Sequence, residues 1–219
     1  MNKNKTLVLF GGTGGLGSQL KVKLDTDYNI ISLGSKDVDV INYNDVKDFF
    51  LENKADIVVN LSGYNYNSFL HKYSDNNLTE RQKLIDVNII GNLNILSNCL
   101  SQMRKRNYGR IILASSVLSS RPAIGTSVYS GCKAFIDNLA KTCTLENLSK
   151  GITCNTLQLG YFDGGLVYEI PTAIREKIKE SIPLKRWGTI EEIENTIRYL
   201  INTEYVSGCS MKVNGGLDF

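Results

Sequence analysis

A tyrosine and a lysine lie four residues apart where a helical pattern begins, at Tyr129 and Lys133. Residues with this spacing share one face of a helix. A free phenol has a pKa of about 10 and exchanges protons poorly at neutral pH. A nearby ammonium favours the phenolate, so we expect Lys133 to lower the pKa of Tyr129 and make it an acid–base group. Many helices carry this spacing by chance, so the pair needs support from other segments.

A glycine-rich segment, Gly11–Gly17, follows the apolar run Leu7–Phe10 and precedes a helical pattern. Glycines at such a junction let the backbone turn tightly and approach a pyrophosphate, which then lies at the helix N-terminus. The many glycines leave three spacings open, two starting at Gly11 and one at Gly12. No Gly-Lys-Ser/Thr follows, which excludes a P-loop. The segment predicts a dinucleotide-binding loop.

The end of the second expected strand bears on the choice of dinucleotide. An acidic residue there binds the adenosine ribose and marks NAD. Here Ile30–Leu33 is followed by Gly34, Ser35 and Lys36, and the first carboxylate is Asp37. Ser35 and Lys36 suit a 2′-phosphate, so we expect NADP, with NAD as the alternative.

Short apolar runs alternate with longer amphipathic ones along the chain, which predicts an α/β fold: one doubly wound, Rossmann-type parallel sheet with helices on both faces. The expected strands are Leu7–Phe10, Ile30–Leu33, Ile57–Leu61, Ile111–Ala114, Thr153–Leu159 and Met211–Val213, with a further short one at Val38–Ile41. The expected helices are Leu16–Leu24, Asn44–Glu52, Leu78–Arg104, Val128–Leu148 and Ile190–Ile201.

Composition excludes several classes of protein. The 219 residues predict a single domain, 1–219, and the net charge of +3 is not typical of nucleic-acid binding. The one histidine, His71, makes a multi-histidine zinc site improbable, and we expect no metal. Five cysteines without a C-x-x-C pair indicate reduced thiols. No apolar run approaches the length of a membrane span, so we expect a cytoplasmic protein that binds no membrane.

The expected helix Leu78–Arg104 carries apolar residues on nearly every side between Leu84 and Met103. A helix of this kind is usually covered on both sides. It is either a deep core helix or part of a subunit interface, and the sequence favours neither.

Further segments stand in a fixed order around Tyr129-x-x-x-Lys133. They are Gly11-x-x-x-Gly15-x-Gly17, Asp39-Val40, Asn60-Leu-Ser-Gly63, Asn88, Ser116 (thirteen residues before Tyr129) and Lys212-Val-Asn-Gly-Gly216. Together they resemble the short-chain dehydrogenase/reductase family in its single-domain form, and the resemblance covers essentially the whole chain. The last segment resembles the ending of members similar to 3-oxoacyl-carrier-protein reductase.

The resemblance implies the catalytic residues. Tyr129 would be the general acid in carbonyl reduction and the base in alcohol oxidation. Lys133 would lower the pKa of Tyr129 and hold the nicotinamide ribose. Ser116 would polarise the reacting oxygen, and Asn88 would keep a water in a proton relay to Lys133. The expected cofactor contacts are Gly11, Thr13, Gly15, Leu16, Gly17, Ser35, Lys36, Asp39, Val40, Asn60, Ser62, Gly63, Tyr129, Lys133 and Gly160.

Some segments depart from the family pattern. Phe10 stands where the family usually has threonine, and Gly164 aligns with the threonine that often touches the carboxamide. The connection from Gly34 to Val38 is too short for the usual second helix, as in sugar-nucleotide reductases of a longer related branch. The polar, aromatic segment Tyr64–Tyr73 is either a solvated loop or the lining of a site for a hydroxyl-rich substrate. The segment Tyr161–Pro183 is expected to form a short lid.

These observations predict an NAD(P)-dependent oxidoreductase that reduces a ketone or oxidises a secondary alcohol. A 3-oxoacyl thioester is one candidate substrate, and a sugar or polysaccharide precursor is the alternative. A dinucleotide-binding sensor without chemistry is the alternative of another class. The family resemblance and the apolar helix together predict a homodimer or homotetramer.

Overall fold

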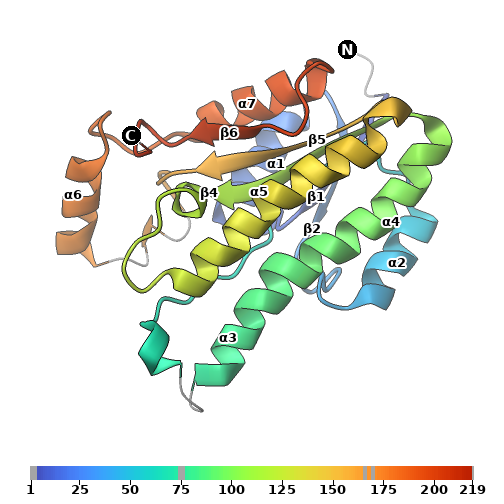
Figure 1. Cartoon of the computed structure of the whole chain (residues 1–219). Coiled ribbons are helices and arrows are strands. Elements are labelled where there is room, and N and C mark those ends of the chain that lie inside the picture. The colour runs from blue at the N-terminus through green and yellow to red at the C-terminus, as the bar shows by residue number, and fades with distance from the viewer. Residues whose placement is uncertain (1–3, 74–76, 165–166, 169–170, 219) are drawn as a thin grey trace.

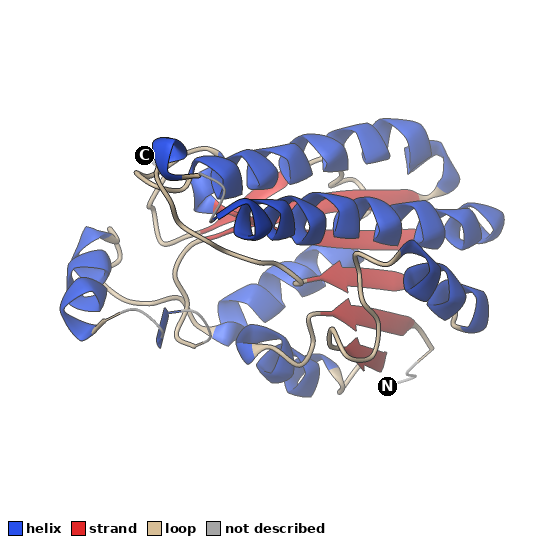
Figure 2. Cartoon of the chain, turned by 90° about the horizontal axis from the view of Figure 1, so that it is seen from below, coloured by secondary structure: helices blue, strands red, loops and turns tan. Residues whose placement is uncertain are grey.

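The computed structural model describes residues 4–73, 77–164, 167–168 and 171–218. Its six strands form one parallel sheet in the order β2-β1-β3-β4-β5-β6 (Figures 1 and 2). The strands are β1 (Thr6–Phe10), β2 (Asn29–Leu33), β3 (Ile57–Asn60), β4 (Gly109–Ser116), β5 (Ile152–Leu159) and β6 (Ser210–Val213). The doubly wound parallel sheet expected from the sequence is confirmed.

Helices cover both faces of the sheet. They are α1 (Gly15–Leu24), α2 (Tyr43–Glu52), α3 (Leu78–Ile85), α4 (Gly91–Arg106), α5 (Ser127–Asn147), α6 (Thr172–Ser181) and α7 (Ile190–Asn202). Figure 1 shows α2, α4 and α5 in front of the sheet, with α1 and α7 behind it. Each layer has its own apolar core, one around Phe10, Val58 and Ile136 and the other around Leu9, Leu20 and Ile197. Strands covered on both faces read as continuous apolar runs.

The expected strand at Val38–Ile41 is wrong. The segment does not pair with β2, which is an edge strand of the sheet. Instead, the side-chain amide of Asn94 on α4 donates to the carbonyl oxygens of Val40 (3.0 Å) and Ile41 (3.2 Å). A short apolar run can satisfy its backbone on a helix as well as on a strand, and the sequence does not show which partner lies beside it.

The expected helix Leu78–Arg104 is interrupted by one π turn, Asp86–Ile90, between α3 and α4. Such turns occur frequently at functional sites. The segment Tyr161–Pro183 forms no strand in its described part, as expected, but it contains helix α6, which the sequence reasoning missed. Residues 165–166 and 169–170 of this segment lie outside the described residues.

All strands run in the same direction, so their carboxyl ends meet at one edge of the sheet, on the left in Figure 1. Ligands of open α/β sheets bind at this edge. The glycine loop, the segment after β3 and the start of α5 all lie there. Among the described residues, no helix is long and apolar enough to cross a membrane.

Candidate active site

The glycine loop lies between β1 and α1 and is packed too closely for side chains at two positions. A Cβ at Gly11, where φ is +71°, would lie 2.7 Å from the backbone nitrogen of Ser62. A Cβ at Gly17 would lie 2.2 Å from the carbonyl oxygen of Gly11. Helix α1 begins at Gly15 with no side-chain cap and no acidic residue in its first turn. The backbone N–H groups of Gly15, Leu16 and Gly17 at this helix end suit a phosphate.

The substitution Gly17→Ala tests the packing of the glycine loop. Because the Gly17 Cβ would meet backbone atoms rather than a flexible side chain, Gly17→Ala must displace the Gly11–Gly14 turn. We expect the Kd for the dinucleotide to rise at least tenfold and the Tm to fall by several degrees. Fluorescence titration and thermal unfolding measure the two effects. An alanine variant with wild-type affinity would contradict this packing.

Thr13, Ser35 and Lys36 lie together where β2 ends. Thr13 packs against Gly34, since a Cβ built on Gly34 would lie 2.3 Å from the Thr13 hydroxyl oxygen. Ser35 and Lys36 follow directly and are exposed. The first carboxylate, Asp37, folds back and accepts a hydrogen bond from the Gly34 backbone N–H (2.7 Å). This carboxylate is therefore occupied by its own turn, while the hydroxyl and the ammonium remain exposed.

Asp39 and Val40 lie on the α4 side of the same edge. Val40 is buried and lies against Gly91, where a Cβ would approach its side chain to 2.8 Å. Asp39 accepts a hydrogen bond from the Ile41 backbone N–H (3.1 Å), and Asn94 holds the next carbonyl groups. The segment therefore has a fixed path although it is not a strand.

Ser116, Tyr129 and Lys133 come together at the carboxyl end of β4. Ser116 is the last residue of β4, and its hydroxyl oxygen accepts a hydrogen bond from the Leu118 backbone N–H (3.2 Å). Helix α5 begins at Ser127, so Tyr129 and Lys133 lie in its first two turns. The Lys133 ammonium lies 5.5 Å from the centroid of the Tyr129 ring and donates to the carbonyl oxygen of Ala114 (2.9 Å).

The sequence predicts that the pKa of Tyr129 is lowered, and for the protein chain without a bound cofactor this direction is wrong. Burial raises the pKa of Tyr129 to about 12, and a hydrogen bond with the Ser116 hydroxyl lowers it only in part. Burial also lowers the pKa of Lys133 to about 8. Both side chains lie in surroundings that disfavour their charged forms. The site therefore holds Tyr129 as a neutral phenol, which is a proton donor.

The segment after β3 lies beside the same lysine. Asn60 is buried, and its side-chain oxygen accepts from the backbone N–H (2.9 Å) and the hydroxyl (2.5 Å) of Ser62. Gly63 is exposed, and a Cβ built on it would lie 3.4 Å from Oδ1 of Asn88 and 3.5 Å from Nζ of Lys133. Asn88 is fully buried in the π turn. The structure thus brings Asn60, Ser62, Gly63 and Asn88 into one cluster with Lys133.

Gly160 follows β5 and packs against β6 rather than presenting a surface. Its backbone N–H donates to the Val213 carbonyl oxygen (2.9 Å), and a Cβ on Gly160 would lie 2.8 Å from the Cα of Asn214. The glycine therefore lets the two strand ends approach each other. Any cofactor contact at this position comes from its backbone.

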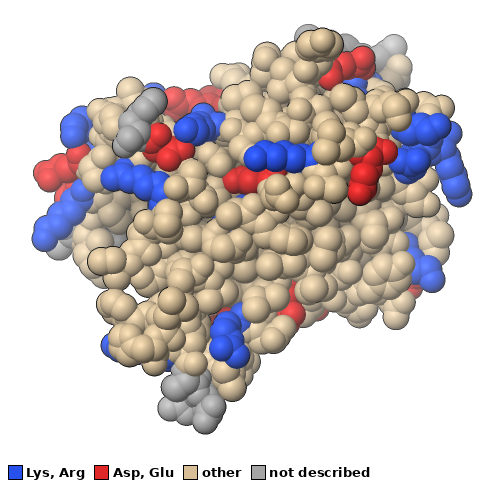
Figure 3. All heavy atoms as spheres, viewed as in Figure 1, with Lys and Arg blue, Asp and Glu red and all other residues tan. Residues whose placement is uncertain are grey.

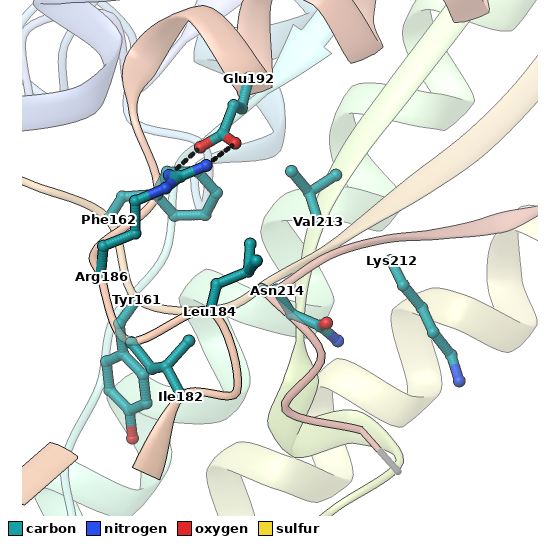
Figure 4. Close-up of a pocket in the computed structure, with 11 residues that line it drawn as sticks. Tyr161, Phe162, Ile182, Leu184, Arg186, Glu192, Lys212, Val213 and Asn214 are labelled. Carbon is teal, nitrogen blue, oxygen red and sulfur yellow. Dashed lines mark hydrogen bonds and ion pairs between the residues drawn. The ribbon is translucent and has the colours of Figure 1, made fainter. Parts of the chain in front are cut away.

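A cavity of about 220 Å³ lies next to Gly160, beneath the connection between α6 and α7 (Figure 4). Its lining combines apolar side chains with charged and amide groups, and Arg186 and Glu192 face each other at one end in an ion pair of 2.8 Å. Tyr161 lines the cavity and contacts the ring of Trp187 edge to face, with a centroid separation of 6.1 Å. The Tyr161 phenol is also close enough to Tyr129 to raise its pKa slightly. Tyr161 thus lies between the cavity and the surroundings of Tyr129.

The segment Tyr64–Tyr73 lies beside the loop that leads into α5, because the Ser68 backbone N–H donates to the Gly125 carbonyl oxygen (2.8 Å). Its tyrosine hydroxyls already have partners within this region. Tyr64 donates to Glu80, Tyr66 donates to Asn77 (3.2 Å) and Tyr73 donates to the Tyr66 carbonyl oxygen (3.4 Å). The side chains that this segment exposes to solvent include the apolar Phe69 and Leu70.

Sequence reasoning missed two residues that hold the site together, Asn92 and Asn94. Asn94 fixes the Val40 segment, and Asn92 bridges Asn60 and Asn88. A signal was present in the sequence, since asparagine is a poor helix former and four of them occur between positions 88 and 98. Polar residues at core positions of a helix indicate buried hydrogen bonds.

The chain is similar to known oxidoreductases. The family model described as enoyl-(acyl carrier protein) reductase matches residues 33–218. The protein is 26% identical over 244 residues to the 3-oxoacyl-[acyl-carrier-protein] reductase FabG of Staphylococcus epidermidis, covering 98% of this chain and 99% of that protein. It is 32% identical over 167 residues to nodulation protein G of Azospirillum brasilense, covering 75% of this chain and 67% of that protein.

Two further comparisons agree. Acetoacetyl-CoA reductase of Allochromatium vinosum is 31% identical over 164 residues, covering 74% of this chain and 65% of that protein. A solved structure titled "ElxO with NADP Bound" superposes with a TM-score of 0.87 at 20% identity, covering 97% of this chain and 98% of that one. With its doubly wound sheet and the match over residues 33–218, the chain belongs to the short-chain dehydrogenase/reductase family of NAD(P)-dependent oxidoreductases.

Proposed function

We propose that this protein reduces a ketone to a secondary alcohol with NADPH, and that the ketone is a 3-oxoacyl thioester. The observation that carries the proposal is the arrangement of Ser116, Tyr129 and Lys133 at the carboxyl end of β4, where the Lys133 ammonium lies 5.5 Å from the centroid of the Tyr129 ring. The Tyr129 phenol holds its proton at neutral pH, because burial keeps its pKa high. A carbonyl oxygen that gains a hydride at its carbon needs that proton. The same phenol is a poor base for alcohol oxidation until its proton has left.

The protein residues divide the work as follows. Ser116 donates a hydrogen bond to the substrate carbonyl oxygen and polarises it. Tyr129 transfers its proton to that oxygen as the alcohol forms, and the phenolate that results is stabilised by the ammonium of Lys133. Asn88 keeps a water from which Lys133 and then Tyr129 regain the proton. NADPH, when bound, supplies the hydride.

The residues of the glycine loop and of the β2 turn suit such a dinucleotide. Gly11 and Gly17 pack directly against neighbouring backbone, which holds the loop in a tight turn at the N-terminus of α1. The solved structure that superposes on this chain is titled "ElxO with NADP Bound", so that protein binds NADP. In this chain, Ser35 and Lys36 would hold the 2′-phosphate, since Asp37 is occupied by the Gly34 backbone.

The choice of cofactor can be tested at Lys36. We expect wild-type protein to bind NADPH more tightly than NADH. Lys36→Glu places a negative charge beside the 2′-phosphate and should weaken NADPH binding by roughly tenfold or more, with NADH binding little changed. Fluorescence titration of both cofactors measures this. Lys105→Glu, an equal charge change at the far end of α4, is the control. A wild-type preference for NADH would reject the assignment.

An acyl substrate is supported by the apolar surroundings of the site. Val117 and Leu118 follow Ser116 directly and pack with Ile182, Leu217 and the rings of Tyr161 and Trp187. Phe69, Leu70 and Ile124 lie exposed on the two neighbouring loops. Two of the relatives are named as reductases of 3-oxoacyl and acetoacetyl thioesters. The sugar alternative is weaker, because the tyrosine hydroxyls of the Tyr64–Tyr73 segment already have partners.

A panel assay tests the substrate class. Purified protein is mixed with NADPH or NADH and with 3-oxoacyl thioesters, keto-sugars or simple ketones, and the loss of reduced cofactor is followed by absorbance. We expect turnover with the thioesters and NADPH. Turnover confined to keto-sugars would favour the sugar alternative, and cofactor binding without any turnover would favour a sensor.

The surface over α4 and α5 supports a homo-oligomer. Apolar side chains remain exposed along it, with Leu93 at 37%, Ile90 at 38% and Leu145 at 85%. Figure 3 shows that the middle of this face carries few charged side chains. The expected helix Leu78–Arg104 is thus apolar on nearly every side for two reasons. Leu84, Ile95 and Met103 are buried in the core, whereas Ile90 and Leu93 lie on this outer face. Light scattering measures whether the protein is a homodimer or a homotetramer.

A further inference from the structure

The chain between β2 and α2 has little secondary structure to hold it. Residues 34–42 belong to no helix or strand, and β2 is an edge strand of the sheet. The connection from Gly34 to Val38 closes as one turn, in which the Val38 backbone N–H donates to the Gly34 carbonyl oxygen (3.2 Å). The residues that follow, 38–42, therefore need contacts from a neighbouring element to keep a fixed path.

Asn94 on α4 supplies such contacts. The residue is 9% exposed, and its side-chain nitrogen donates to the carbonyl oxygens of Val40 (3.0 Å) and Ile41 (3.2 Å). The reversed amide would set its oxygen against both carbonyls, so these hydrogen bonds assign the orientation of the side chain. One amide group thus holds two successive peptide groups of the segment.

Helix α4 approaches the segment closely because it begins at Gly91. A Cβ on Gly91 would lie 2.8 Å from Cγ2 of Val40. Gly91 and Asn94 are three positions apart and share one face of the helix. This face of α4 therefore takes the place of the neighbouring strand or helix that residues 38–42 lack.

The hydrogen bonds of the segment leave two backbone donors free. The Ile41 N–H donates to the Asp39 carboxylate (3.1 Å), and the Asn42 N–H donates to the Asp39 carbonyl oxygen (3.0 Å). The N–H groups of Asp39 and Val40 have no partner among the described residues. Val40 is buried, and an unpaired N–H in a buried residue is uncommon. This donor suits an acceptor atom of a bound ligand.

The position of the segment indicates which part of the dinucleotide it meets. It follows directly after Ser35 and Lys36, which would hold the 2′-phosphate, at the edge of the sheet where ligands bind. The adenosine that carries this phosphate therefore lies beside residues 38–42. Its base has ring nitrogens that accept hydrogen bonds, as the Val40 N–H requires.

We propose that Asn94 is a positioning residue that holds residues 38–42 ready for the adenosine half of the cofactor. The amide of Asn94 is occupied by the segment, so it acts through Val40 rather than on the cofactor. Without its two hydrogen bonds, cofactor binding would have to order the segment, and that conformational entropy would weaken binding. The inference rests on the proposed reductase function with NADPH and adds Asn94 to it.

The substitution Asn94→Leu tests this role, because it nearly keeps the volume of the side chain and removes both donors. We expect the Kd for NADPH and the Kd for adenosine 2′,5′-bisphosphate to rise by roughly tenfold. The KM for NADPH should rise with them, whereas kcat at saturating NADPH should stay within about twofold. Fluorescence titration, with the bisphosphate as competitor, measures both affinities.

Asn98→Leu is the matched control. Asn98 lies one turn later on α4, and its amide donates to the Asn94 carbonyl oxygen (2.9 Å) within the helix rather than to residues 38–42. We expect wild-type affinities in this variant. A purely structural role would lower the Tm of Asn94→Leu and leave both Kd values unchanged, which would overturn the proposal and leave the reductase function untouched. Wild-type protein that binds neither NADPH nor the bisphosphate would overturn the proposal together with the cofactor assignment.

Hydrogen exchange of the wild-type protein tests the segment without a substitution. We expect adenosine 2′,5′-bisphosphate to slow exchange of the Val40 amide by roughly tenfold or more, because the ligand accepts from it. The Ile41 amide already has a partner and should change less. Unchanged exchange at Val40 with the ligand bound would overturn the proposal, and this measurement decides the question if Asn94→Leu does not fold.

Discussion

Replacing Tyr129 with phenylalanine should lower the rate of ketone reduction by about 10²–10⁴-fold. The substitution removes only the hydroxyl, which is the proposed proton donor and interacts with Ser116. The ring, which lies 5.5 Å from the Lys133 ammonium, remains in place, so the cofactor site keeps its shape. The Kd for NADPH should therefore change by no more than about twofold.

Two measurements make this result specific. Turnover is followed by the absorbance of NADPH, and binding is followed by fluorescence, on the same preparation. Tyr199→Phe is the control, because Tyr199 is 48% exposed on α7. Undiminished turnover in Tyr129→Phe would remove Tyr129 from the mechanism. Equal losses of turnover and of NADPH affinity would show that the hydroxyl binds the cofactor instead of donating the proton.

Replacing Lys133 with methionine should abolish turnover and at the same time stabilise the fold. Lys133 is 3% exposed, and burial lowers the pKa of its ammonium to about 8. A pKa lowered from 10.5 to about 8 corresponds to a cost of about 3 kcal/mol for holding the charge inside the protein. Methionine avoids this cost but loses the hydrogen bond to Ala114. We expect a net gain of about 1–3 kcal/mol and a Tm several degrees higher.

The pH dependence of stability identifies the lysine as the cause. Below about pH 8 both folded and unfolded chains hold the proton, and the full cost is present. Between about pH 8 and 10.5 the unfolded chain binds more protons than the folded one, so the free energy of unfolding rises with pH. The difference between Lys133→Met and wild type should therefore shrink over this range.

Other groups titrate at similar pH values. The pH dependence of the free energy of unfolding is therefore compared between Lys133→Met, wild type and a control variant. Burial raises the pKa of Tyr129, Tyr161 and Tyr28, and their contribution to stability is lost as the pH rises above about 10. Tyr28 and Tyr161 are common to both proteins and cancel in the difference, and the comparison is read below about pH 10, where Tyr129 keeps its proton. Lys141→Met, on the exposed side of the same helix, should show no such effect. A Lys133→Met protein less stable than wild type at neutral pH would contradict the cost assigned to the ammonium.

Local patterns were sufficient for most of the fold. The apolar runs predicted all six strands, and their ends differ from the observed ones by no more than two residues. The glycines between Phe10 and Leu16 predicted the loop, because the junction of a strand and a helix permits few alternatives there. Val38–Ile41 was assigned wrongly, since its carbonyl groups found Asn94 on a helix 53 and 54 positions along the chain.

The sequence by itself determined which residues could do chemistry here. Tyr129 and Lys133 share a helix face through their spacing alone, and Ser116 ends a strand whose apolar pattern is plain. Their charge states were decided by the tertiary structure. Burial is a property of everything packed around a side chain, so it reversed the shift expected for Tyr129 and lowered the pKa of Lys133. Likewise, only the packing of the end of β3 against α4 brings Asn60, Asn92 and Asn88 into contact. Among the described residues, Oδ1 of Asn88 is left without a hydrogen-bond partner by this arrangement.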